Sequence, residues 1–184
     1  MPLVIHETFF YTSDTLKNGG REMFGFLKKK NEVVENNTMY AVANGTVIPI
    51  SEVNDPVFSQ KMMGDGYAVV PENGEIYAPI EGEVLSVFQT KHAIGLITES
   101  GMEILIHVGI DTVKLNGSHF ETFVKVDDQV KVGEQILTFD RKEIEALGYD
   151  TTVIMIITNA NHYKDIVEMK SGSVTSKDEV LTTV

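Results

Sequence analysis

Short apolar runs separated by turn-forming residues make up most of the sequence after residue 39. Val, Ile, Tyr and Phe are common within these runs. Such runs between closely spaced turns are typical of all-β sandwiches and barrels. The turn signals are Asn44-Gly45, Asn54-Asp55-Pro56, Gly64-Asp65-Gly66, Pro71-Glu72-Asn73-Gly74, Glu81-Gly82, Ser100-Gly101, Asn116-Gly117 and Val132-Gly133. The sequence therefore predicts an antiparallel β-sandwich or barrel. Helical periodicity predicts a few short helices, at residues 55–62, 118–123 and 141–147.

The length of the chain indicates how many domains it can form, and its net charge indicates which partners it can bind. A chain of 184 residues that is 42% hydrophobic can form one domain with a substantial core. Residues 1–22 are polar and lack periodicity, and the strand pattern begins at Met39. We therefore expect a flexible N-terminal extension at 1–38 and a single domain at 39–184. The net charge of −12 argues against nucleic acid as a partner.

The absence of cysteine and of long apolar segments narrows the location and the chemistry. No apolar run is long enough to cross a bilayer, so the chain is not expected to be an integral membrane protein. The first residues do not resemble a signal peptide. Without cysteine there is no disulfide framework, no thiolate nucleophile and no thiolate metal ligand. These features favour a cytoplasmic location.

Two histidines lie on neighbouring apolar runs that we expect to form an antiparallel hairpin. His107 lies within the run at 102–113, His92 lies on the preceding run, and Glu99-Ser100-Gly101 separates the two runs. A two-residue turn within that tripeptide makes the histidines diagonal or direct neighbours on one face. A three-residue loop would place them on opposite faces. The two-residue turns predict a polar cluster of Thr90, His92, His107 and Asp111.

Three chemistries would use such a cluster. His92, His107 and Asp111 have the ligand types for zinc, but the sequence lacks the usual metal-binding spacings, and we expect no cofactor. A His–Asp pair could serve a serine nucleophile, but there is no Gly-x-Ser-x-Gly elbow. The third chemistry is the carriage of a phosphoryl group on a histidine, which needs neither a metal nor a thiol.

Phosphoryl carriage places specific demands on the residues around the nucleophile. The nucleophilic imidazole must be neutral, with its other nitrogen donating a proton to a fixed acceptor. Gly109 leaves room for a backbone carbonyl to approach that N–H of His107. A second N–H donor is needed for the phosphoryl charge, and His92 is placed to supply it, with the Thr90 hydroxyl orienting its ring. Apolar surroundings would exclude water.

The motifs carrying these residues resemble the glucose-family enzyme IIA (EIIA) of the bacterial phosphoenolpyruvate–sugar phosphotransferase system. Thr90-Lys91-His92-Ala93 is followed, fifteen residues after His92, by His107-Val108-Gly109-Ile110-Asp111-Thr112-Val113. Asp55-Pro56-Val57-Phe58-Ser59-Gln60-Lys61-Met62-Met63-Gly64-Asp65-Gly66 is similar to the upstream segment of the family. Ala78-Pro79-Ile80-Glu81-Gly82 and Val130-Lys131-Val132-Gly133 are similar to its hairpins. The likeness runs from about Met39 almost to the C-terminus.

The resemblance implies a β-sandwich of barrel-sandwich-hybrid type and a protein-histidine phosphotransferase role in sugar uptake. His107 would take a phosphoryl group on Nε2 from the carrier HPr and pass it to the cysteine of a sugar-specific EIIB domain, which works with the membrane permease EIIC. His92 would stabilise the group, with Thr90 hydrogen-bonded behind it. The implied partner-binding residues are Asp55, Val57, Phe58, Met62, Met63, Phe88, Asp111 and Val113.

Two other classes of function stay open at this stage. A regulatory module could use the same apolar face to dock on permeases or metabolic enzymes according to its phosphorylation state. In such a complex, zinc could bridge His92, His107 and a partner carboxylate. A purely structural, hairpin-rich domain would take up no phosphate.

Overall fold

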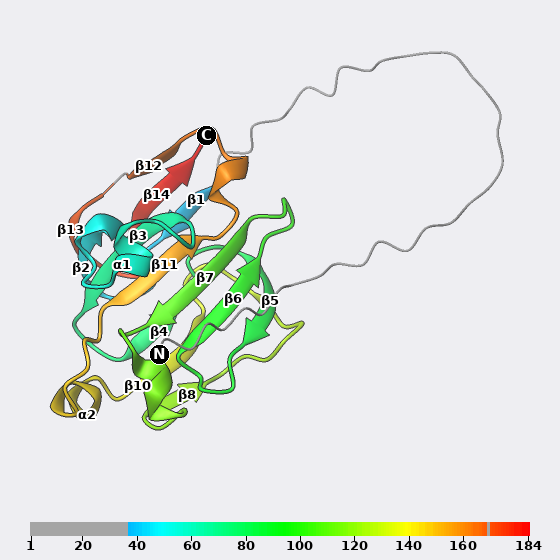
Figure 1. Ribbon diagram of the computed structural model, residues 1–184. Coiled ribbons are helices and arrows are strands. Elements are labelled where there is room, and N and C mark those ends of the chain that lie inside the picture. Colours follow the sequence, from blue (N-terminus) through cyan, green and yellow to red (C-terminus); the bar gives the residue numbers. More distant parts are fainter. Residues whose placement is uncertain (1–36, 169) are drawn as a thin grey trace, which may run out of the picture. The chain divides into compact units, whose positions relative to one another are not determined.

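The computed structural model describes residues 37–168 and 170–184, which form a β-sandwich (Figure 1). The predicted N-terminal extension lies almost entirely outside these residues. The predicted all-β fold is confirmed. Its strands are β1 (Thr38–Tyr40), β2 (Gly45–Pro49), β3 (Asp65–Pro71), β4 (Glu75–Tyr77), β5 (Gly82–Val87), β6 (Ala93–Ile97), β7 (Glu103–Val108), β8 (Phe120–Thr122), β9 (Gln129–Val130), β10 (Gln135–Phe139), β11 (Val153–Ile157), β12 (Ile166–Glu168), β13 (Gly172–Val174) and β14 (Glu179–Thr183).

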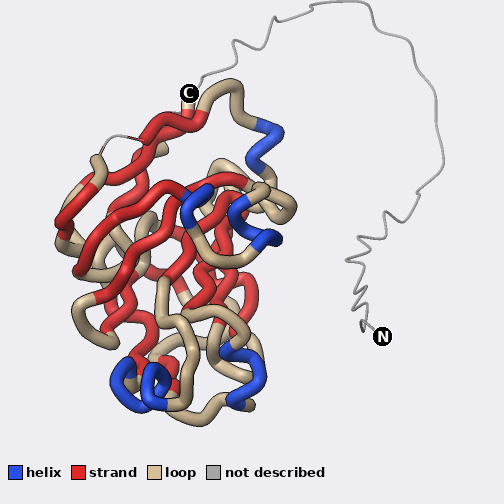
Figure 2. Tube along the Cα trace, turned by 60° about the vertical axis from the view of Figure 1, so that its left-hand side comes forward, coloured by secondary structure: helices blue, strands red, loops and turns tan. Residues whose placement is uncertain are grey.

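Helical segments are short and lie in the connections, as the tube in Figure 2 shows. The α-helices are α1 (Pro56–Ser59) and α2 (Arg141–Ala146). The 3-10 turns are η1 (Ile50–Glu52), η2 (Thr112–Leu115) and η3 (Ala160–His162). Two of the predicted helices are found in shortened form. The third, at 118–123, is wrong, because Phe120–Thr122 instead pairs with β10 as strand β8.

The described strands form one large sheet and two small ones. The large sheet has the order β13-β2-β3-β11-β7-β6-β5-β9, and the small sheets have the orders β1-β14-β12 and β4-β10-β8. Every pairing among the described strands is antiparallel. The large sheet therefore places β7, which carries His107, between β6 and β11.

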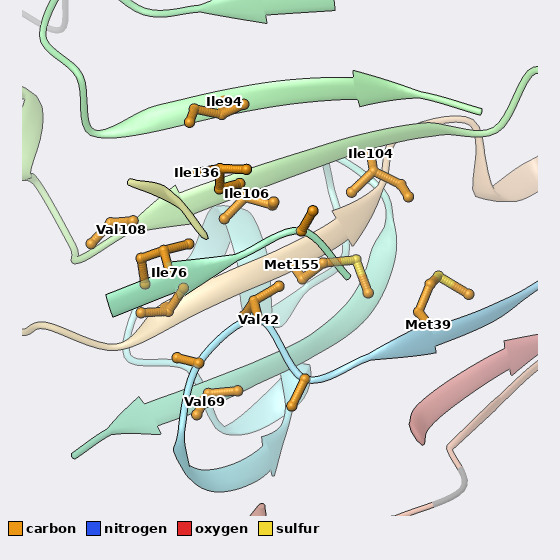
Figure 3. Packing of buried hydrophobic residues seen from close by; sticks show 14 of the residues in the cluster. Met39, Val42, Val69, Ile76, Ile94, Ile104, Ile106, Val108, Ile136 and Met155 are labelled. Atoms are coloured by element: carbon orange, nitrogen blue, oxygen red, sulfur yellow. The ribbon is translucent and has the colours of Figure 1, made fainter. Parts of the chain in front are cut away.

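Strand β11 is buried on both faces, which explains its uninterrupted apolar sequence. Val153, Met155 and Ile157 belong to the main core, where residues of the large sheet meet those of the small sheets. Figure 3 shows part of this core, including Met155 of β11. Ile154 and Ile156 point to the other face. On that face they pack in a second, smaller cluster with Ile50, Val53, Phe58 and Ala68. The segment containing η1 and α1 therefore covers part of the outer face of the large sheet.

Candidate functional site

The loop at the tip of the β6–β7 hairpin differs from the predicted two-residue turn. Ala93 pairs with His107 and Ile97 with Glu103. Thr98 accepts a backbone hydrogen bond from Gly101 and donates one to Met102, at 2.9 and 3.0 Å. Glu99-Ser100-Gly101 is therefore a three-residue loop, and both two-residue readings are wrong. In this register, strict alternation would place His92 and His107 on opposite faces of the sheet.

The two rings nevertheless meet, because His92 lies just outside the regular strand. Residues 88–92 form the tight connection between β5 and β6, in which the Lys91 N–H donates to the Phe88 carbonyl at 2.8 Å. Lys91 has a left-handed φ of 54°. This conformation interrupts the alternation of side chains immediately before His92. The small side chain of Ala93, directly opposite His107, leaves space beside the ring.

The two imidazole rings are in edge-to-face contact. Their centroids are 4.8 Å apart and their planes are inclined at 87°. Phe58 contacts the His107 ring at a centroid distance of 5.1 Å, and Phe88 contacts the His92 ring at 5.6 Å. Each imidazole therefore contacts both the other imidazole and a phenyl ring.

Thr90 lies beside the Nδ1 edge of His92, in the position predicted from the sequence. Its hydroxyl oxygen is 2.7 Å from Nδ1 of His92. A threonine hydroxyl that donates to Nδ1 leaves the ring proton on Nε2, so that Nε2–H can donate to a ligand. Burial lowers the pKa of His92, which favours the neutral ring.

His107 lies in surroundings that keep it uncharged. Burial, followed by the neighbouring His92, lowers its pKa to about 4, and this decrease outweighs the smaller raising effects of the Gly109 backbone and Asp111. Nδ1 of His107 is buried and has no hydrogen-bond partner of standard geometry. The Gly109 backbone is nevertheless close enough to raise the pKa of the ring. A backbone group raises the pKa of a histidine by accepting its N–H, so the Gly109 backbone can accept an Nδ1 proton.

The chain turns sharply at Gly109, immediately after β7. Gly109 has a φ of 76°, and a Cβ at this position would lie 2.8 Å from the Asp150 carbonyl oxygen and 2.5 Å from Cγ2 of Thr112. Only glycine fits this turn without displacing the backbone. The Gly109 N–H donates to the Thr152 carbonyl at 2.9 Å, which ties the turn to the segment before β11.

Exposed apolar side chains lie on α1 and the segment after it, in the connection between β5 and β6, and on η2. Val57 lies in α1, and Met62 lies just after it, where its N–H donates to the Val57 carbonyl at 3.0 Å. The exposed members of the predicted partner-binding set are Val57, Met62, Met63, Phe88 and Val113. Phe58 differs from them: it is only 6% exposed and packs inward against His107. Phe58 therefore contacts the histidine site from inside, because α1 turns its side chain toward the sheet, and its role in partner binding stays a prediction.

The two predicted partner-binding aspartates already have partners within the chain. Asp55 accepts a hydrogen bond from the Val57 N–H at 2.7 Å and caps α1. Asp111 forms an exposed ion pair with Lys114 at 2.6 Å. Asp55 therefore has a local structural role, and Lys114 partly neutralises the charge that Asp111 offers to a partner.

The described residues define neither a preformed metal site nor a membrane span. Within 37–168 and 170–184, no three His, Cys, Asp or Glu side chains are grouped so that they could hold a metal ion. His92 and His107 offer two nitrogen donors, so zinc would need a further ligand from a partner. None of the helices in the described part of the chain is long and apolar enough to cross a bilayer.

The fold and the site together define a β-sandwich protein with a paired-histidine site beside exposed apolar side chains. A family profile described as phosphoenolpyruvate-dependent sugar phosphotransferase system, EIIA 1, matches residues 37–163. The chain belongs to this family, and is an EIIA component of a sugar phosphotransferase system.

Similar proteins include both a separate EIIA and fused proteins. The glucose-specific EIIA component of Oceanobacillus iheyensis is 45% identical over 147 residues, covering 80% of this chain and 89% of that protein. The glucose-specific EIICBA component of Streptococcus pneumoniae is 44% identical over 142 residues, covering 77% of this chain. The match spans only 20% of that fused relative. Among solved structures, the glucose permease IIA from Mycoplasma capricolum aligns with a TM-score of 0.75 and 38% identity, covering 80% of this chain and 96% of that one.

Proposed function

We propose that this protein accepts a phosphoryl group from phospho-HPr on Nε2 of His107 and passes it to the cysteine of a sugar-specific EIIB domain. The single observation that carries the proposal is the perpendicular imidazole pair, with centroids 4.8 Å apart. One ring of the pair has its pKa lowered to about 4. The other is oriented by a hydroxyl 2.7 Å from its Nδ1.

The acceptance step balances without a cofactor. The Nε2 lone pair of neutral His107 forms a bond to phosphorus as the bond to the donor nitrogen of HPr breaks. The proton of His107 stays on Nδ1, facing the Gly109 backbone. Transfer between two imidazoles is nearly balanced in energy, so the site acts mainly by positioning the groups and excluding water. The low pKa of His107 keeps the lone pair available at neutral pH.

His92 supports the proposal as a donor to the transferred group. With Thr90 on its Nδ1, the Nε2–H of His92 can donate to a phosphoryl oxygen bound to His107. A neutral donor places no second positive charge beside His107 that would lower its basicity further.

Delivery to EIIB and EIIC is supported by the relatives. Some relatives of this chain are named EIICBA components, in which the EIIA part is fused to EIIB and EIIC parts. This chain has no cysteine, so the acceptor thiol lies on another domain. Because the relatives are named as glucose-specific, a glucose EIIB domain is the first acceptor to test. These names do not favour the regulatory alternative over carriage.

The acceptance step can be tested with purified components. Incubation with phosphoenolpyruvate, enzyme I and HPr should give an acid-labile phosphoprotein. His107→Gln should not be labelled, whereas His162→Gln, which changes an exposed histidine of η3, should be labelled like the unmodified protein. Undiminished labelling of His107→Gln would refute the role of His107.

The delivery step distinguishes the role of His92 from that of His107. His92→Gln should still accept a phosphoryl group but should deliver it more slowly to EIIB, because the donor to the phosphoryl oxygens is lost. The measurement is the decay of the labelled protein after addition of a glucose EIIB domain. Delivery at the unmodified rate would contradict the role of His92.

A further inference from the structure

The proposed chemistry makes one demand on the backbone after β7. His107 can offer its Nε2 lone pair only if Nδ1 carries the proton, and Nδ1 is buried. Burial prevents water from accepting that proton, so a protein atom must do so. The Gly109 backbone, two residues after His107, acts on the ring as an acceptor and raises its pKa. On the proposed chemistry, the position of the Gly109 turn would therefore determine which nitrogen of His107 holds the proton.

Thr112 fixes this turn through two separate contacts. Its hydroxyl donates to the Val108 carbonyl at 2.5 Å. Its methyl group occupies the space beside Gly109, where Cγ2 lies 2.5 Å from the position of a Cβ. Thr112 is completely buried. The turn that it closes contains two left-handed residues, Gly109 and Asp111, with φ of 76° and 62°.

We propose that Thr112 is a positioning residue for His107, holding the Val108–Gly109 backbone so that Nδ1 of His107 keeps its proton and Nε2 keeps its lone pair. The inference rests on the proposed phosphoryl transfer. It assigns the hydroxyl a role in addition to stability. A buried hydroxyl that only filled space would leave the imidazole unchanged when it was removed.

Two substitutions separate the two contacts of Thr112. Thr112→Val keeps the shape and the methyl group beside Gly109 but removes the hydrogen bond to Val108. Thr112→Ser keeps the hydrogen bond and removes the methyl group. Thr98→Val is the matched control, because Thr98 is also a buried hydroxyl of the β6–β7 hairpin, where it accepts from the Met102 N–H at 3.0 Å at the loop end.

The first measurement is the tautomer of His107, read from its ¹⁵N chemical shifts in the full protein. The unmodified protein and Thr98→Val should show the proton on Nδ1. Thr112→Val should show a mixture of the two tautomers, and Thr112→Ser should restore the Nδ1–H form. An unchanged tautomer in Thr112→Val would overturn the inference.

The second measurement is the single-turnover rate of phosphoryl transfer from phospho-HPr. Thr112→Val should be slower by about tenfold to a hundredfold, the loss expected from a misplaced reacting group. Thr112→Ser should recover most of the rate. An equal loss in Thr98→Val and Thr112→Val would show a purely structural role and overturn the inference. If Thr112→Val fails to fold, Thr112→Ala removes the same hydroxyl and carries the same predictions.

Failure of the proposed function can be distinguished from failure of this inference. If the unmodified protein takes up no phosphoryl group, the proposed function fails. The tautomer comparison still decides whether Thr112 positions the His107 ring. If the unmodified protein is phosphorylated and Thr112→Val matches it in rate and tautomer, only the role of Thr112 is refuted.

Discussion

The His107 ring stays neutral over a range in which an ordinary histidine gains charge. A sequence-based estimate uses the typical pKa of about 6.5 and expects transfer to fail below that pH. Burial beside His92 lowers the pKa to about 4 instead. The pH at which His107 is expected to lose its lone pair by protonation is therefore lower than the sequence alone predicts.

An NMR titration of the His107 ring protons tests this shift directly. We expect a midpoint near pH 4, because charging the ring requires a buried site to hold a cation. Phosphoryl acceptance should then not be limited by protonation of His107 near pH 6. Phe58→Ala opens the site to water and should move the midpoint upward. A midpoint of about 6.5 in the unmodified protein would contradict the burial argument.

Gly109 and Gly101 form a matched pair of left-handed glycines, with φ of 76° and 85°. Gly101→Ala should cost about 1–2 kcal/mol, since the strained backbone is its only penalty and nothing lies within 4 Å of the new methyl group. Gly109→Ala should cost about 1–3 kcal/mol more, because its methyl group meets the Asp150 carbonyl and Thr112. Denaturant unfolding measures both. Equal losses would show that the Gly109 turn relaxes freely.

At the scale of elements, α1 contributes both to the exposed surface, through Val57, and to the histidine site, through Phe58. Asp55 caps this helix, and Phe58, in its single turn, packs against His107. Asp55 also has the charge that the family resemblance assigns to partner binding. Two substitutions can separate these roles, because an asparagine side chain keeps a capping oxygen without the charge.

Asp55→Asn should leave the free energy of unfolding nearly unchanged and should slow association with phospho-HPr at low salt. Asp55→Ala should slow association similarly and also lose about 1 kcal/mol of stability, because the Val57 N–H loses its acceptor. Stopped-flow association and denaturant unfolding provide the two measurements. Equal stability of the two variants would show that the cap does not stabilise α1. If both variants associate with phospho-HPr at the unmodified rate, Asp55 does not take part in partner binding.

The positions of the strands were more predictable from the sequence than the loops between them and the register of their pairing. Closely spaced turns and β-branched runs indicate strands directly, and the sandwich followed from them. The register of β6 and β7 was not predictable, since Glu99-Ser100-Gly101 can form a two- or a three-residue loop. A difference of one residue in the loop moves every side chain of the strand to the other face of the sheet. The rings still meet because of Lys91, whose left-handed φ gives no signal in a lysine. Thr112 was missed for a similar reason, since a threonine after Asp111 looks like an ordinary turn residue.

At the scale of the whole domain, the described residues form two cores on either side of the large sheet. The main core is between the sheets, and the smaller one lies under η1 and α1 beside the site. Strand β11 contributes to both, and its Ile154 pairs with His107. The environment that lowers the pKa of His107 is therefore part of the packing that stabilises the domain. Stability and the protonation of the site should consequently be coupled.

This coupling predicts how stability depends on pH. Because folding lowers the pKa of His107, the unfolded chain binds more protons between about pH 6.5 and pH 4, so the free energy of unfolding falls as the pH falls through this window. Lowering the pKa of His107 from 6.5 to about 4 corresponds to about 3 kcal/mol of stability at neutral pH. His107→Gln removes the titrating group, so its stability should decline less than that of the unmodified protein over this range. His162→Gln is the control, and its decline should match the unmodified protein. Denaturant unfolding at a series of pH values gives the comparison. Parallel curves for His107→Gln and the unmodified protein would mean that His107 is not buried as a neutral ring in solution.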